Sequence, residues 1–154
     1  MTPHAGTATP PEARATEDVR TQGPAISSGG RIMAVVMVPG KPELVPVLRA
    51  LVGSLLADHP AVDDIRLMAT ETIGNAIRHT RSGQDGGMLI LTVLDRGRVK
   101  RVEVIDEGCT AGDPHPRNNT QASEDGYGLQ LVAALAAKWE TAPWGEGSQT
   151  WFEI

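Results

Sequence analysis

The stretch ETIGNAIRHT, residues 71–80, carries the pattern from which both the fold and the site are predicted. Its apolar residues recur at the spacing of one helix face, and Glu71 and Asn75, four residues apart, share another face. Asp64 and Arg78 continue that polar face. A carboxylate can accept a proton, and an amide oxygen is a hard ligand that suits Mg²⁺. A solvated helix face without chemistry is the alternative, and spacing alone leaves both interpretations open.

Outward from this stretch, the periodic pattern predicts a helix over residues 62–80, preceded by another helix and a strand. The earlier helix lies between Lys41 and Pro60 and carries four leucines at helical spacing. Residues 32–38 form a short, Val-rich apolar run that ends at Pro39-Gly40, which is typical of a strand.

Downstream of residue 80, the sequence predicts two strands, at residues 88–94 and 99–105, joined by a hairpin turn. Residues 106–125 are turn-forming and have little to bury, as in a lid or a disordered segment. A helix over residues 127–138 and a closing hairpin over residues 139–154 follow. Strands and helices are grouped instead of alternating. This order favours an α+β sandwich, one sheet with its helices on one face, over a doubly wound parallel sheet.

Length and composition indicate one domain. The chain has 154 residues, 40% of them apolar, which is enough to close a single core. Residues 1–30 are rich in Ala, Thr, Pro, Gly and Ser and lack apolar periodicity, so we predict a disordered tail there and a domain at residues 31–154.

Several classes of protein are excluded on the same basis. The single Cys109 rules out an internal disulfide framework and a Cys-based zinc site. No apolar run is long enough for a membrane span, and the N-terminus has no secretory pattern, so we expect a cytoplasmic protein. A net charge of -5 argues against a non-specific nucleic-acid binder.

Two further segments have the chemistry to contact a ligand. Asp106 ends an apolar strand beside Glu107-Gly108, where a carboxylate can accept from an exocyclic amine next to a flat ring; an ordinary turn-forming Asp is the alternative. The segment GYGL at residues 126–129 leads from the long loop into a helix, where backbone N–H groups can approach a phosphate. A flexible hinge is the alternative there. Neither a Walker loop nor a dinucleotide fingerprint is present.

In this order the motifs resemble the GHKL ATPase superfamily: the Glu71-x-x-x-Asn75-Ala box, Asp106-x-Gly108, and Gly126-x-Gly128 followed by a helix. Within it, the chain is similar to the small anti-sigma regulatory factors of the serine-protein-kinase branch, over about residues 31–154. The resemblance implies the two-layer Bergerat sandwich of the histidine kinase-like ATPases, a mixed sheet with helices on one face.

The resemblance also implies ATP and Mg²⁺ as cofactors and a role for each matching residue. Asn75 would bind the Mg²⁺ that bridges the ATP phosphates, and Glu71 would be the general base toward a substrate Ser hydroxyl. Asp106 would recognise the adenine amino group with Gly108 beside it, and Thr150 would support the adenine through a water.

Four consecutive residues would position the lid and the phosphates: Gly126, Tyr127, Gly128 and Leu129. Two positions depart from the family pattern, since Thr110 stands where a second glycine is common and Tyr127 where Arg is common. Phosphoryl transfer depends on positioning and charge stabilisation, so the missing cation has to come from elsewhere. Three basic residues are candidates: Lys100, Arg101 and Arg117.

The function implied is that of an ATP-binding anti-sigma-type regulator with protein serine kinase activity. Its partners would be a sigma factor and a small Ser-bearing anti-sigma-factor antagonist, with no nucleic acid and no membrane, and a homodimer is left open. One alternative is a module that binds ATP to shape a protein-binding surface without transferring phosphate. Another is an isolated sensor histidine kinase catalytic domain, which the lack of a dimerisation helix pair with a phosphoacceptor His disfavours.

Overall fold

A computed structural model describes residues 30–109 and 127–154 of the chain. The predicted tail at residues 1–30 lies outside the described residues except for Gly30. The same holds for most of the predicted loop, including Thr110, Arg117 and Gly126.

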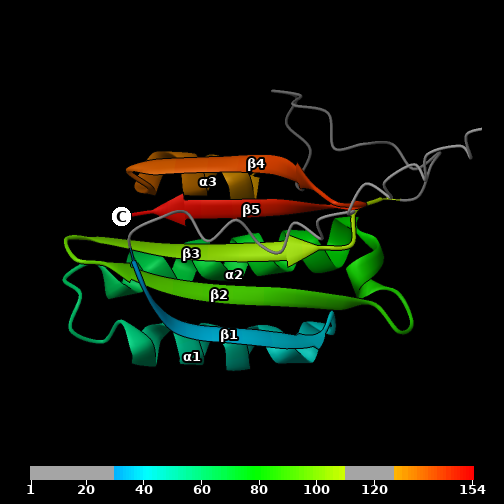
Figure 1. Ribbon diagram of the computed structural model, residues 1–154, viewed down its shortest axis with the longest axis horizontal. Helices are drawn as coiled ribbons and strands as arrows, with labels where there is room; N and C mark the ends of the chain where they lie inside the picture. Colours follow the sequence, from blue (N-terminus) through cyan, green and yellow to red (C-terminus); the bar gives the residue numbers. More distant parts are fainter. Residues whose placement is uncertain (1–29, 110–126) are drawn as a thin grey trace, which may run out of the picture.

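One sheet of five strands forms one layer of the molecule (Figure 1). In spatial order its strands are β1 (Arg31–Pro39), β2 (Met88–Arg96), β3 (Val99–Asp106), β5 (Gly147–Glu153) and β4 (Lys138–Trp144). Every neighbouring pair is antiparallel. The hairpins at residues 88–105 and 139–154 are confirmed, with strand ends extended by one or two residues.

The expectation of a mixed sheet is corrected by this topology. Strand β4 runs in the same direction as β3, but the two are not neighbours, because the chain turns back and inserts β5 between them. The turn is a two-residue connection closed by the pair Trp144 and Gly147, and Gly145 has a φ of +55° there. A left-handed conformation of this kind favours glycine.

Three α-helices of the described part of the chain cover one face of the sheet and complete a two-layer α+β sandwich (Figure 1). Helix α1 (Val45–Leu55) follows a single 3₁₀ turn (Pro42–Leu44), and α2 (Val62–His79) matches the predicted helix to within one residue. Helix α3 (Tyr127–Leu135) ends three residues before residue 138, the predicted end of this helix. The reason is a tertiary hydrogen bond: the Ala137 N–H donates to the Glu153 carbonyl oxygen at 2.8 Å, which draws the chain into β4.

The hydrophobic core lies between the helices and the sheet. It is aliphatic apart from Phe152, as the low aromatic content requires, and α2 supplies the largest share, with Ile65, Met68, Ala69, Ile73, Ala76 and Ile77. Helix α2 packs against both α1 and α3. It is therefore the central helix of its layer, and its polar face is held in a defined position relative to the sheet.

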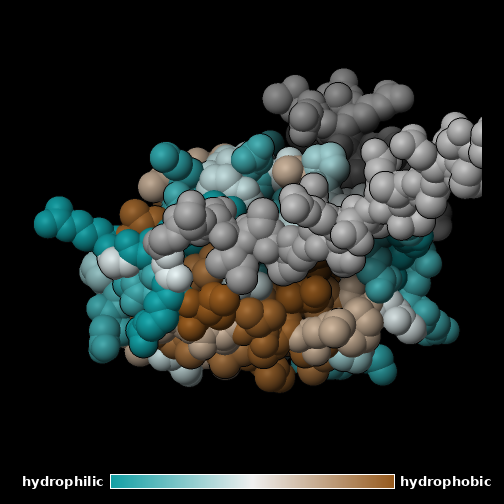
Figure 2. Space-filling view, viewed as in Figure 1, coloured by the Kyte–Doolittle hydropathy of each residue, from teal (hydrophilic) through white to brown (hydrophobic). Residues whose placement is uncertain are grey.

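Within the described residues, no helix covers the other face of the sheet, and this face is apolar over β1 and β2 (Figure 2). Val35 and Met37 on β1 are among its exposed large apolar residues. On β3 the same face carries the buried pair Arg101 and Glu103, and the Arg101 guanidinium lies 3.7 Å from the centre of the Trp151 ring. None of the helices in residues 30–109 and 127–154 is long and apolar enough to cross a membrane.

Candidate functional site

The polar face of α2 lies against the beginning of α3. Glu71 and Asn75 are half-buried there. A Cβ placed on Gly128 would lie 2.5 Å from Glu71 Oε2 and 3.4 Å from Asn75 Nδ2, so a larger residue there would displace the Glu71 carboxylate from its present position. The structure thus brings together three residues that the sequence placed in two separate motifs.

A cation lies beside Asn75. Arg78, one turn further along α2, donates a hydrogen bond from Nη2 to Asn75 Oδ1 at 2.9 Å. Gly74 leaves room for this side chain, since a Cβ there would lie 2.9 Å from Arg78 Nη1. The sequence placed Arg78 on the polar face of the helix but assigned it no role, and only the contact with the amide oxygen makes it a candidate site residue.

Asp106 forms the second part of the site at the end of β3, where its side chain is buried. Its Oδ1 accepts the Gly108 backbone N–H at 2.8 Å, and its Oδ2 accepts the Ser148 hydroxyl at 2.7 Å. Burial raises the pKa of this carboxyl above its ordinary value, and the hydrogen bonds from Ser148 and Gly108 partly oppose that shift. A buried carboxylate with spare acceptor lone pairs is suited to receiving an amine.

The packing of the chain around position 108 requires glycine there. Its φ is +68°, and a Cβ would lie 2.6 Å from the Glu146 carbonyl oxygen. On the facing strand, a Cβ on Gly147 would lie 1.8 Å from the Asp106 carbonyl oxygen. The two glycines let the end of β3 touch the β4–β5 turn, and this contact sets Ser148 opposite Asp106.

Thr150, the hydroxyl that the resemblance assigned to the adenine, lies two residues further along β5. It pairs with Val104, and its hydroxyl shares a hydrogen bond with the Thr141 hydroxyl at 3.0 Å. Ser148 pairs with Asp106 and contacts its carboxylate. Sequence reasoning missed Ser148, and a signal for it was present in the glycine before it, which allows the close approach of the two strands.

The 3₁₀ turn that follows α2 (Arg81–Gly83) is bonded to the segment that follows β3. The Arg81 N–H donates to the Gly108 carbonyl oxygen at 2.7 Å, and the Arg81 guanidinium donates to the Glu107 carbonyl oxygen. Buried Ser82 accepts the Glu107 N–H at 2.9 Å and donates to the Met88 carbonyl oxygen at 2.6 Å. These bonds join the helix that carries Asn75 to the strand that carries Asp106.

The remaining predicted site residues have different surroundings. Tyr127 is 61% exposed at the first position of α3, and Leu129 is half-buried. Lys100 bonds Asp95, and Arg101 bonds Glu103 on the sheet face opposite Asp106. Neither of these cations is therefore placed beside Asn75, whereas Arg78 is. Gly126 and Arg117 lie outside the described residues.

The oxygen atoms of the site suit a metal ion that is coordinated mainly by phosphates and waters. Within the described part of the chain, no three His, Cys, Asp or Glu side chains form a group that could hold an ion. Asn75 offers one amide oxygen, which suits Mg²⁺, since this ion is commonly held by one or two protein ligands together with phosphates and waters. This oxygen accepts the Arg78 N–H and has a second lone pair that can meet an ion.

Comparison with known proteins places the sequence in a family. Residues 38–153 match the family model for the histidine kinase-like ATPase domain. Among solved structures, the crystal structure of the RsbU and RsbW domains of Rv1364c from Mycobacterium tuberculosis is similar, with a TM-score of 0.56 and 17% sequence identity. The match covers 78% of this chain and 31% of that one. None of the curated proteins compared with the sequence matches it. The family match spans most of the chain and includes both parts of the site, so the chain belongs to the histidine kinase-like ATPase domain family.

Proposed function

We propose that this protein binds ATP with its adenine at Asp106 and its phosphates near Asn75. The observation that carries the proposal is the buried Asp106 carboxylate, which two hydrogen bonds orient at the end of β3 within a histidine kinase-like ATPase fold. A carboxylate there accepts the adenine amino group and disfavours guanine, which presents a carbonyl at the same position.

Ser148 is the hydroxyl that we assign to adenine support. It holds one oxygen of Asp106 and can also contact the ring through a water. Thr150 remains a candidate from the family resemblance, but its hydroxyl is shared with Thr141. The two assignments differ in one testable respect, because only Ser148 contacts the carboxylate.

Asn75 would hold Mg²⁺ together with the ATP phosphates, with Glu71 beside it. The bound ion would neutralise phosphate charge. Arg78 supplies a positive group at the same place, which supports a phosphate site even though the segment 126–129 carries Tyr127 and no Arg. Gly126, Tyr127, Gly128 and Leu129 would position the phosphates from the start of α3.

We further propose that the protein is an anti-sigma-type regulator that phosphorylates a Ser of a small antagonist domain, with a sigma factor as its other partner. Glu71 would accept the proton of the Ser hydroxyl while the hydroxyl oxygen attacks the γ-phosphorus and the bond to the β-phosphate oxygen breaks, releasing ADP. The half-buried position of Glu71 beside Asn75 supports this role. The fold shared with a structure that contains an RsbW domain is consistent with it.

One observation favours a second candidate, an ATP-binding interaction module without transfer. Tyr127 is exposed at the position where a cation is common in the family, and it supplies no charge to a transition state. Both candidates predict ATP binding, so they separate only at the transfer step.

The test combines binding with transfer. Wild-type protein should bind Mg·ATP by calorimetry and transfer labelled phosphate to a Ser-bearing antagonist domain. Asn75→Ala should weaken binding and abolish its dependence on Mg²⁺. Glu71→Gln should leave ATP affinity within a few-fold and slow transfer by about 10² to 10⁴. Tight wild-type binding without transfer to any cognate antagonist would leave only the binding module, and unchanged binding in Asn75→Ala would reject the assignment of the phosphate site.

A further inference from the structure

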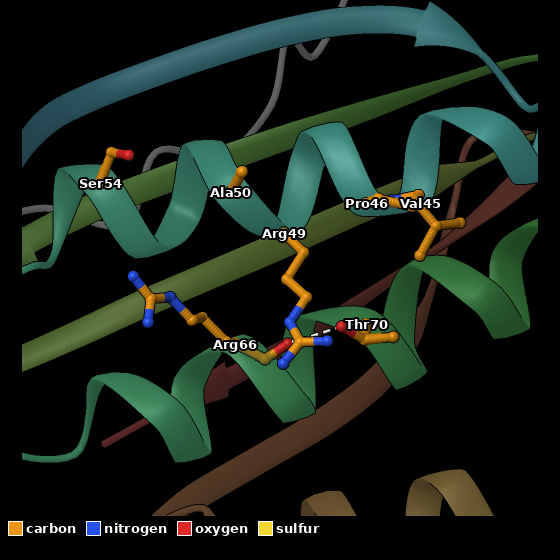
Figure 3. A pocket seen from close by; sticks show the side chains of 7 residues that line it. All are labelled: Val45, Pro46, Arg49, Ala50, Ser54, Arg66 and Thr70. Carbon is orange, nitrogen blue, oxygen red and sulfur yellow. Dashed lines mark hydrogen bonds between the residues drawn. The ribbon is translucent and has the colours of Figure 1, made fainter.

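A groove lies between α1 and α2. Its cavity volume is about 390 Å³, and it is lined by Val45, Pro46, Arg49, Ala50 and Ser54 from α1 and by Arg66 and Thr70 from α2 (Figure 3). The α1 side supplies aliphatic surface, and each helix contributes one arginine. The groove therefore has an aliphatic surface on α1, which we call its floor, formed by Val45, Pro46 and Ala50, and two positive charges, Arg49 and Arg66.

Arg66 is held in place by the packing of the two helices. Its guanidinium lies over Gly53 of α1, where a Cβ would be 2.0 Å from Arg66 Nε, so any larger residue at position 53 would displace it. Nη1 also contacts Asp63 at 3.0 Å. The Arg66 side chain is 36% exposed, whereas the Asp63 side chain is 91% exposed. A cation packed in this way loses little conformational freedom when an anion binds it.

Arg49 reaches across the groove from α1 toward Thr70 on α2 (Figure 3). It is exposed, and within residues 30–109 and 127–154 it forms no ion pair. The two guanidinium groups thus line one groove, and among the residues that line it in the described part of the chain there is no carboxylate. In a chain with a net charge of -5, this is a local excess of positive charge.

We propose that this groove docks an acidic segment of a partner protein, with carboxylates paired to Arg49 and Arg66 and an apolar side chain over Val45, Pro46 and Ala50. Guanidinium groups pair well with carboxylates, and the aliphatic floor matches an apolar anchor between them. A nucleic-acid backbone would bring many phosphates to two arginines in an acidic protein and would leave the floor unused. The chemistry therefore favours a protein segment.

The groove and the nucleotide site share α2 but use different sides of it. Thr70 lines the groove, and its neighbour Glu71 lies against Gly128 of α3. The inference rests on the groove alone and does not require that ATP be bound or hydrolysed. Its test therefore measures ATP affinity separately, so that failure of one proposal is distinguishable from failure of the other.

The experiment selects a ligand without assuming its sequence. The full chain is immobilised and used to select peptides from a random 12-residue display library, and the most enriched peptide is synthesised and titrated by fluorescence anisotropy. We expect enriched peptides to combine Asp or Glu with aliphatic residues. Arg49→Gln and Arg66→Gln should each weaken the affinity for the synthetic peptide by about fivefold to tenfold, which is about 1 to 1.4 kcal/mol.

The matched control is Arg98→Gln, which removes one exposed positive charge from the β2–β3 turn, away from the groove. It should leave peptide affinity within twofold, and the melting temperatures of all three variants should stay within about 2 °C of wild type, since the charges removed are surface charges. Several results would overturn the proposal: no enrichment of acidic peptides, equal weakening by Arg98→Gln, or a heparin fragment or inorganic phosphate that displaces the peptide at lower concentration than an acidic competitor peptide. The last result would indicate a general anion site.

Discussion

Ser148 and Asp106 face each other on neighbouring antiparallel strands, and the Ser148 hydroxyl donates to Asp106 Oδ2 at 2.7 Å. The Gly108 N–H donates a hydrogen bond to the other carboxylate oxygen, Oδ1. A carboxylate held at both oxygens has a fixed orientation and retains lone pairs for a further donor. The adenine recognition that we propose at this position therefore depends on a contact between two strands whose partners lie 42 residues apart in the chain.

Asp106→Ala should weaken ATP binding by about 1.5 to 3 kcal/mol, the range for a hydrogen bond to a charged group. Ser148→Ala should have a smaller effect, about 0.5 to 1.5 kcal/mol, because it removes only the orienting bond. Thr150→Val is the matched control and should leave affinity unchanged if Ser148 is the supporting hydroxyl. Calorimetry with ATP and with GTP measures all three, and a larger loss in Thr150→Val than in Ser148→Ala would return that role to Thr150.

The raised pKa of Asp106 predicts a pH dependence of stability in the absence of ligand. Because the folded state binds the proton more tightly than the unfolded state, the carboxyl contributes most at acid pH. This contribution is lost as pH rises from the ordinary value of 3.8 through the raised folded value. The free energy of unfolding of wild type minus that of Asp106→Asn should therefore fall as pH rises through that window. Urea titrations between about pH 3 and pH 7 measure it.

Asp95 supplies a comparison of opposite sign. Its hydrogen bond with Lys100, helped by the Gly97 N–H, lowers its pKa below 3.8. Its contribution to stability is present above the ordinary value and is lost as pH falls through the lowered one. The difference between wild type and Asp95→Asn should therefore decrease toward acid pH. If this difference changed with pH in the same direction for Asp95→Asn and Asp106→Asn, the opposite pKa shifts of the two carboxyls would be wrong.

Arg78→Gln should separate phosphate recognition from adenine recognition. The variant removes the cation beside Asn75, so we expect ATP to bind about tenfold more weakly, the loss of one charge-assisted contact, while adenosine affinity stays unchanged. Arg98→Gln controls for the change in net charge. An equal loss for ATP and adenosine would show that Arg78 acts by positioning Asn75 or the helix, and that it does not meet the phosphates.

Gly128→Ala tests the contact between α2 and α3. The added methyl would lie 2.5 Å from Glu71 Oε2, so the Glu71 carboxylate must move aside or the start of α3 must shift, at a cost of at most about 3 kcal/mol in the free energy of unfolding. Glu71→Ala removes that oxygen, and the double variant should recover most of the loss in a double-mutant cycle by urea unfolding. Additive losses would mean that Glu71 is not the residue that Gly128 approaches.

The buried ion pair of Arg101 and Glu103, on the sheet face away from the helices, should contribute to stability and have no role in nucleotide binding. Glu103 contacts Arg101 at 2.6 Å and Gln149 at 3.1 Å, and both members of the ion pair are buried. Glu103→Ala removes the nearest carboxylate of Arg101 and leaves Glu153, at 3.2 Å, as its remaining ion-pair partner, so the loss should be about 1 to 3 kcal/mol, below that for a buried charge left without a partner. The exposed pair is the control, since Asp63→Ala should cost less than about 1 kcal/mol. ATP affinity at temperatures well below unfolding should not change.

Local patterns in the sequence determined most of the secondary structure, the fold class and several candidate site residues. The period of 3.6 residues predicted α2 nearly to its ends, and the strand and turn residues predicted both hairpins, because these features depend on side chains a few positions apart. Glu71 and Asn75 share one helix face for the same reason. Grouped strands and helices indicated the two-layer α+β class, and Asp106 was recognisable as a carboxylate that ends an apolar strand.

The tertiary structure decided what depends on contacts between distant segments. The insertion of β5 between β3 and β4 made every neighbouring pair antiparallel, and the bond from Ala137 to Glu153 ended α3 early. Side chains alternate along a strand, so the pairing register of β3 and β5, which no local pattern encodes, set Ser148 against Asp106 and left Thr150 two positions away. Packing of α3 against α2 then brought Gly128 to Glu71, because a contact of this kind exists only once the core has placed both helices.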